Sequence, residues 1–402
     1  MKPGLRRLPV VAGCVVALSA SPARAQQPVT REGAVASAQA RGARAGLARA
    51  DSAAARAEVT IARAFGNPIL SASYSKSTPQ LHAIMELPLG FPWIRSARVG
   101  AASAGQRSAD YRVAFERAAV RFDAETAYDR ALAAAYHVRL SRRTADAADS
   151  LLRMARVRRD AGDASDLDVE LAVVNAGQLA AAATDDSVAG VEALLDLQMV
   201  MGLPGDTARI VLADSLALAA PDTALPSVLP TLRVASAGAA LEASEAEVTF
   251  QHRNLFAPPA LQFGVESHDP SQPGLLPTFG LVLPLPLLNF NGGPIAAAEA
   301  ARDRARVERE AAQRESDADV AQARRLVVVT RAKAERSQAL QASAERVAAM
   351  SLRAYAEGAI ALPAVLEAQR NAQELLTRHV DDLAAAAAAA SALRLVTAAA
   401  QP

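Results

Sequence analysis

Two similar stretches decide the fold: RRDAGDASDLDV at 158–169 and AYAEGAIALPAV at 354–365. In each, a glycine (Gly162 or Gly358) separates two long segments with helical periodicity. A glycine just after a helix readily adopts the left-handed conformation that ends it. Ser165 suits the N-cap of the returning helix in the first copy, and Pro363 suits the first turn of the second. The sequence therefore predicts two helical hairpins with tight tips.

The helices that lead into these tips are unusually long. Residues 101–161 contain no proline and a single glycine, Gly105, and about 60 helical residues would span about 90 Å. The second copy runs over 295–357, and the returning arms over 165–201 and 362–398. Apolar residues recur at spacings of three, four and seven, so a coiled-coil rod is one interpretation of this part of the chain.

Four segments with alternating apolar and polar residues precede the long helices. They lie at 69–76, 81–89, 260–267 and 276–287, and each pair predicts a β-hairpin. Membrane barrels start at eight strands, and unpaired strand edges do not occur in lipid. If these strands lie in an outer membrane, several copies must share one barrel, and three copies would supply twelve strands. Glu86 and Glu266 lie on polar strand faces, so we expect them to line the barrel lumen.

Aromatic residues flank the strand pairs, where an interfacial girdle is expected in a membrane barrel. An alternative interpretation is that they pack at a soluble junction between strands and helices. These residues are Phe65, Phe91, Trp93, Phe256 and Phe290.

Composition and the N-terminus indicate an exported protein. The 402 residues include 43 Lys+Arg and 42 Asp+Glu, which gives no electrostatic reason to expect nucleic acid as a partner. A basic start, an apolar stretch at 8–20 and Ala23-Arg24-Ala25 predict a signal peptide over 1–25. Val11-Ala12-Gly13-Cys14 also has the form of a lipoprotein signal, so Cys14 is either acylated or lost with the peptide. No later segment has the apolar length of a transmembrane helix.

Motifs of catalysis are absent from the sequence. It contains no phosphate-binding, dinucleotide-binding, nucleophile-elbow or H-E-x-x-H motif. The 5 histidines are far apart in the sequence and lack the spacing of metal ligands. We therefore expect no enzyme, no cofactor and no dedicated metal site.

The stretch TFGLVLPLPLLNFNGGPIAAAEA at 278–300 resembles the strand-to-helix passage of the TolC family of trimeric outer-membrane efflux channels. The tips RRDAGDASDLDVELA and AYAEGAIALPAVLEAQR are similar to the family's repeated helical-turn motif. The likeness covers about residues 30–400 and is greatest to the cobalt–zinc–cadmium resistance branch. It departs at Glu170, where the second copy has Leu366, and in the short segment 204–229.

This resemblance implies a mainly α fold with a small β part. Long helical hairpins would form a trimeric α-barrel in the periplasm, and four strands per protomer would contribute to a shared 12-stranded barrel in the outer membrane. The implied organisation is a first repeat over 26–203, an equatorial linker over 204–229 and a second repeat over 230–402.

The resemblance also implies a passive duct. It would form a homotrimer in outer-membrane lipid and receive substrates, divalent heavy-metal cations among them, from a periplasmic adaptor and, indirectly, an inner-membrane pump. Asp166 and Asp168 are candidates for the periplasmic constriction, where three copies would form carboxylate rings. The adaptor contacts would lie at the exposed surfaces of both tips, around Gly162, Ser165, Leu167, Gly358, Ala361 and Leu362.

Two other classes of protein remain as alternatives. A periplasmic adaptor is also built on a helical hairpin, but it usually carries one hairpin rather than two. A structural coiled-coil protein of the cell envelope would explain the long helices, but it leaves the four alternating segments unexplained.

Overall fold

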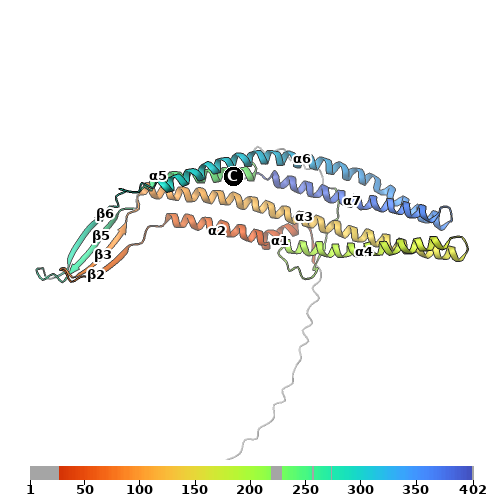
Figure 1. Ribbon diagram of the computed structural model, residues 1–402, viewed down its shortest axis with the longest axis horizontal. Helices are drawn as coiled ribbons and strands as arrows, with labels where there is room; N and C mark the ends of the chain where they lie inside the picture. The colour runs from red at the N-terminus through yellow and green to blue at the C-terminus, as the bar shows by residue number, and fades with distance from the viewer. Residues whose placement is uncertain (1–26, 219–228, 256–257, 273, 401–402) are drawn as a thin grey trace, which may run out of the picture.

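A computed structural model describes residues 27–218, 229–255, 258–272 and 274–400 of the chain. The predicted signal peptide, Cys14 and Phe256 lie outside these residues. The molecule is elongated, with a small sheet at one end, two helical tips at the other and long helices between them (Figure 1).

Two long helices run the length of the helical body, and each turns back at its tip into a shorter one. The first hairpin joins α3 (Pro92–Asp160) to α4 (Asp166–Val200), and the second joins α6 (Gly292–Ala356) to α7 (Leu362–Val396). The 69 residues of α3 span about 100 Å. Helix α3 begins earlier than predicted because Pro92 occupies its first turn, where a missing N–H costs nothing.

Shorter helices extend the two returning arms toward the sheet. Helices α1 (Arg31–Arg41) and α2 (Ala43–Arg63) meet at Gly42, where an added Cβ would lie 3.2 Å from the Val200 carbonyl oxygen at the end of α4. Helix α5 (Leu232–Arg253) begins where α7 ends, since the Leu232 N–H donates to the Ala398 carbonyl at 2.8 Å. One layer of helices therefore has the order α2–α3–α5–α6 near the sheet and α4–α3–α7–α6 near the tips (Figure 1).

The sheet contains β2 (Ile69–Tyr74), β3 (Leu81–Pro88), β5 (Ala260–Ser267) and β6 (Leu276–Val282), in that order and antiparallel throughout. The two predicted hairpins are thus joined through β3 and β5. Strands β2, β3 and β6 are shorter than predicted. Strand β6 ends at Val282 rather than 287, because Pro284 and Pro286 have no N–H for a ladder.

The register gives this sheet one apolar and one mixed polar face. Paired residues on the apolar face include Leu70 with Met85, Met85 with Phe263, and Phe263 with Phe279. Phe279 is 76% exposed, and most large side chains on this face are exposed with it. The opposite face carries serines, His82, Glu86, Gln262 and Glu266, together with some apolar residues. The alternation predicted from the sequence is confirmed.

The main core lies half-way along the helices, on one face of α3. Tyr128, Leu132, Leu197 and Leu383 are buried in it. Two short parallel strands, β1 (Gln27–Val29) and β4 (Ile210–Leu212), cover this core, and their pairing was not predicted for the segment 204–229. Among the described residues, no helix is both long enough and apolar enough to cross a membrane.

Candidate functional site

Both hairpin tips have the same backbone conformation and the same pattern of backbone hydrogen bonds. Gly162 and Gly358 have φ values of +85° and +74°, in the left-handed region predicted for them. In the first tip the Asp163 N–H donates to the Arg158 carbonyl at 2.8 Å, and in the second the Ala359 N–H donates to the Ala354 carbonyl at 2.8 Å. Each reversal therefore satisfies the last carbonyls of its long helix within the tip itself.

The first tip carries charged and exposed side chains. Ser165 caps α4, as predicted, and Asp168 completes a reciprocal capping box: each side chain accepts a hydrogen bond from the other residue's N–H, at 3.1 and 3.0 Å. Asp166 is exposed, with its carboxylate 4.0 Å from the Arg159 guanidinium. The Asp168 carboxylate thus stabilises the start of α4, whereas the Asp166 carboxylate is exposed to solvent.

The second tip is built around apolar contacts between the hairpins. Leu362 is only 2% exposed and packs with Leu151, Val169, Tyr355 and Val365. Our expectation that Leu362 lies on the exposed docking surface is therefore wrong, because the two hairpins pack together over this side chain. Gly162, Ser165, Leu167, Gly358 and Ala361 are all exposed, as a contact surface requires.

Arg158 connects the two tips. From the end of α3 it donates to the Tyr355 carbonyl at 2.8 Å, and its guanidinium carbon lies 4.8 Å from the centre of the Tyr355 ring. The Tyr355 ring is buried, and burial raises the pKa of its hydroxyl, which has no hydrogen-bond partner among the described residues. Arg158 thus adds a polar contact between the ends of the two long helices to the apolar packing around Leu362.

On the polar face of the sheet, each of the two predicted lumen residues, Glu86 and Glu266, lies beside a polar side chain of the neighbouring strand. The Glu266 carboxylate lies 3.4 Å from the His82 Nδ1, and the Glu86 carboxylate lies 3.5 Å from the Gln262 side-chain nitrogen. His82 and Glu266 are opposite each other in the register of β3 and β5, as are Glu86 and Gln262. Within the described residues, no group of three or more His, Cys, Asp or Glu is arranged to hold a metal ion.

Solved membrane channels share this architecture. The chain matches the CmeC outer-membrane channel of Campylobacter jejuni with a TM-score of 0.77 and 14% identity, over 98% of this chain and 94% of that one. It matches a membrane protein from Pseudomonas aeruginosa with a TM-score of 0.76 and 19% identity, over 91% and 93% of the two chains. It matches CusC, a protein that forms a transmembrane channel, with a TM-score of 0.73 and 15% identity, over 92% of each chain.

No protein-family model matches the sequence, and no curated protein is significantly similar to it. The chain has the fold of TolC-family outer-membrane channels. The predicted fold class, mainly helical with a small sheet, is confirmed in its α and β parts. The structures that the chain resembles are channels rather than enzymes.

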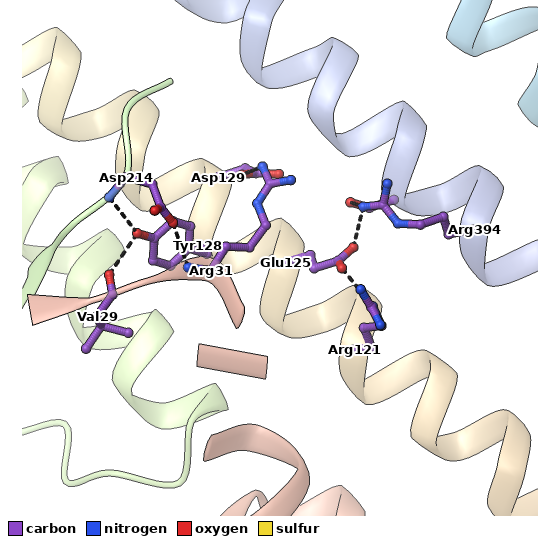
Figure 2. Close-up of polar contacts among 9 residues, drawn as sticks. Val29, Arg31, Arg121, Glu125, Tyr128, Asp129, Asp214 and Arg394 are labelled. Atoms are coloured by element: carbon purple, nitrogen blue, oxygen red, sulfur yellow. Dashed lines mark hydrogen bonds and ion pairs between the residues drawn. The ribbon is translucent and has the colours of Figure 1, made fainter. Parts of the chain in front are cut away.

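A buried charged cluster half-way along α3 was not predicted from the sequence. Arg394 of α7 and Arg121 donate to Glu125 at 2.6 and 2.9 Å, and Arg31 of α1 pairs with Asp129 (Figure 2). The Asp129 residue is 1% exposed, and one of its carboxylate oxygens is buried without a partner among the described residues. The cluster ties both the N-terminal helix and the end of α7 to the middle of α3.

The surroundings of this cluster shift the pKa values of its members in different directions. Burial pushes the pKa of Glu125 upward, but the hydrogen bonds from Arg394 and Arg121 outweigh it and hold the pKa below its usual value. Burial raises the pKa of Asp129, and Arg31 offsets this only in part. Tyr128, whose hydroxyl donates to the Val29 carbonyl at 2.8 Å, has its pKa raised by burial to about 12.

Proposed function

We propose that the protein is a passive outer-membrane channel of a tripartite efflux system, extending into the periplasm as a homotrimer. The observation that carries this proposal is the four-stranded sheet with an exposed apolar face. A face of this kind suits lipid, but its outer strands β2 and β6 have no further partner among the described residues. Unpaired edges are excluded in lipid, so copies of the chain must complete a barrel. Three copies supply twelve strands.

The edges of the helical layer support the same assembly. Near the tips the outermost helices are α4 and α6, and both carry exposed apolar residues at coiled-coil spacing. On α4 these include Leu171 and Val174, and on α6 they include Val347 and Met350. Helix α4 runs away from the tip and α6 toward it, so α4 of one copy can pack antiparallel against α6 of the next.

The lumen of this trimer would be lined by polar groups. The mixed polar face of the sheet would turn Glu86 and Glu266 inward, because the apolar face must meet lipid. At the periplasmic end, three copies of Asp166 would form a carboxylate ring that attracts cations. Asp168 would contribute to this constriction chiefly by fixing the start of α4 through its capping box.

A periplasmic adaptor would dock on the exposed parts of the two tips. Gly162 and Gly358 lack side chains at the surface, and Ser165 and Ala361 are small, so helices of a partner can approach closely. Leu167 would supply an apolar contact, since 67% of it is exposed. The inner-membrane pump would be reached only through this adaptor, and the pump rather than the duct would supply energy.

We propose divalent heavy-metal cations as the cargo. The proposal is supported by the likeness of 278–300 to the cobalt–zinc–cadmium branch and by the carboxylates on the polar face of the sheet. Deletion of the gene should lower the concentration of zinc or cobalt that stops growth, and reintroduction of the chain should restore it. Unchanged metal tolerance together with increased sensitivity to an organic drug would assign a different cargo.

The channel function is tested by membrane fractionation and electrical recording. The full-length protein should be extracted by detergent from the outer membrane as a trimer and should form ion-conducting pores in a planar bilayer. Replacement of Asp166 by Asn should reduce the preference for cations, while Glu170→Gln, a matched change one turn along α4, should change it less. A stable water-soluble monomer would contradict the proposal.

A further inference from the structure

Arginines that form no salt bridge among the described residues gather at the junction between the sheet and the helices. The described stretches that pass through it contain no Asp or Glu: 59–68, 87–106, 248–255, 258–259 and 283–298. The same stretches contain four arginines: Arg63, Arg95, Arg98 and Arg253. Within the described residues, none of the four forms a salt bridge with a carboxylate. No carboxylate of the described residues therefore lies in direct contact with their guanidinium groups, and the nearest acidic residues in the sequence, Glu58, Glu86, Glu247 and Glu299, border these stretches.

Backbone contacts gather these arginines against the end of α2 and the start of α3. Arg98 donates to the Ala62 and Ala64 carbonyls, both at 3.0 Å, and Arg95 donates to the Arg63 carbonyl at 3.0 Å. Arg253 donates to the Trp93 carbonyl at 3.4 Å. Carbonyl groups are neutral acceptors, so these bonds orient the guanidinium groups and leave most of their charge available. The Arg95 Nε is also buried without an acceptor.

Aromatic side chains lie directly beside this charge. The Arg95 guanidinium carbon lies 4.5 Å from the centre of the Phe65 ring, and Phe91 and Trp93 stack with their ring centres 4.3 Å apart. Phe65 and Trp93 are 71% and 52% exposed. The sheet, whose apolar face includes Leu70 and Met85, lies directly beyond the end of α2 and the start of α3 (Figure 1). An apolar zone, aromatic rings and then positive charge is the order in which a leaflet presents acyl chains, interface and phosphates.

We propose that this junction is a collar that binds anionic phospholipid headgroups. The four arginines of each protomer contact lipid phosphates, and Phe65 and Trp93 lie at the boundary between headgroups and acyl chains. The inference rests on the proposed channel function, because it requires the sheet to be inserted in a bilayer. Charge complementarity selects an anionic lipid over a zwitterionic one.

The test measures which lipid the protein retains. The full-length protein is reconstituted into vesicles of equal parts phosphatidylethanolamine and phosphatidylglycerol, extracted gently, and analysed by native mass spectrometry. Arg63→Gln/Arg253→Gln is the informative variant, because Arg95 and Arg98 also support the end of α2. Arg324→Gln/Arg325→Gln, two exposed arginines of α6 away from the sheet, is the matched control. Arg63→Lys/Arg253→Lys keeps the charge.

The unchanged protein and the control should retain an excess of phosphatidylglycerol over phosphatidylethanolamine. In the glutamine variant this enrichment should be lower by about fivefold or more. The lysine variant should keep most of it. Insertion without a lipid preference, or a preference that survives the glutamine changes, would overturn the collar and leave the channel intact. Loss of the trimer with lipid retention unchanged would show that the arginines pair with a neighbouring copy. Failure to insert into any vesicle would overturn the channel as well.

Discussion

The two hairpin tips have the same backbone and different chemistry. Both reverse the chain through a left-handed glycine, yet the residue that opens the returning helix is the exposed Asp166 in one and the buried Leu362 in the other. The first tip stabilises its returning helix with a capping box, while the second has no side-chain cap and relies on Pro363 and on packing. One reversal is thus specified by polar groups and the other by apolar contacts.

This difference assigns separate tasks to the two tips. The second tip supplies the core that joins the hairpins, since Tyr355, Leu362 and Val365 are buried there together. The first tip contributes Val169 to that core but presents its charges to solvent. The first tip therefore supplies most of the charge at this end of the molecule, and the second supplies most of the apolar contacts that join the hairpins.

Exchange of the two opening residues should have the largest effect. Leu362→Asp places a carboxylate in the core between the hairpins, at a cost of about 4 kcal/mol, whereas Asp166→Leu should cost less than about 1 kcal/mol. Amide hydrogen exchange over 345–370 measures the difference, and protection there should fall about a thousandfold in the first variant only. Equal losses in the two variants would contradict the assigned tasks.

A contrast between buried and exposed charge also separates the middle of α3 from the surface of α6. Glu125→Gln removes a buried partner of Arg394 and should cost about 3 kcal/mol at pH 7, while Glu308→Gln, at an exposed pair on α6, should cost about 0.5 kcal/mol. Chemical unfolding of the detergent-solubilised protein measures both.

The effect of Glu125→Gln should depend on pH. The folded-state pKa of Glu125 lies below 4.5, the ordinary value for a glutamic acid, so its stabilising contribution is complete above that value and is lost as the pH falls through the lowered pKa. The unchanged protein and the variant should therefore converge in stability once the pH is below the lowered pKa. A cost that stays the same from pH 7 to pH 3 would show that the charge of Glu125 does not matter.

Substitution of the two tip glycines tests the feature that the tips share, the left-handed backbone conformation. Gly162→Ala and Gly358→Ala should each cost about 1 kcal/mol, because both force a side chain into the left-handed region. An added Cβ meets nothing within 4 Å at Gly162 and only the Arg158 side chain, at 3.6 Å, at Gly358. Gly105→Ala, in the middle of α3 with open space around it, should instead stabilise the protein. Unequal costs at the tips, measured by hydrogen exchange, would mean that one reversal carries additional strain.

Local signals in the sequence predicted the features that depend on neighbouring residues. Gly162, Gly358 and the Ser165 cap are specified within a few residues of the turn, and the strands are specified by their alternation. The limits of β6 could have been placed better, because Pro284 and Pro286 already exclude a longer ladder.

Features that depend on distant residues could not be predicted in this way. Arg31, Asp129 and Arg394 come together only after three helices have packed, and each alone looks like an ordinary charged residue of an amphipathic helix. The burial of Leu362 likewise depends on how one hairpin lies on the other. Strands β1 and β4 are three residues long, which is too short for a periodic signal.

The cap itself provides the smallest and most selective test. Ser165→Ala removes the side-chain oxygen that accepts from the Asp168 N–H, while the backbone N–H of residue 165 can still donate to the Asp168 carboxylate. The change should cost about 1 kcal/mol, seen as faster amide exchange at residues 166–169. Ala361→Ser at the second tip should gain less, since Ala364 stands where the first tip has Asp168 and cannot return a bond. Ala361→Ser/Ala364→Asp restores the reciprocal pair and should slow exchange at residues 362–365 further than the single change does. If the double variant gains nothing, packing of Leu362 already fixes the start of α7 completely, and the polar and apolar ways of starting the returning helix are alternatives rather than additive contributions.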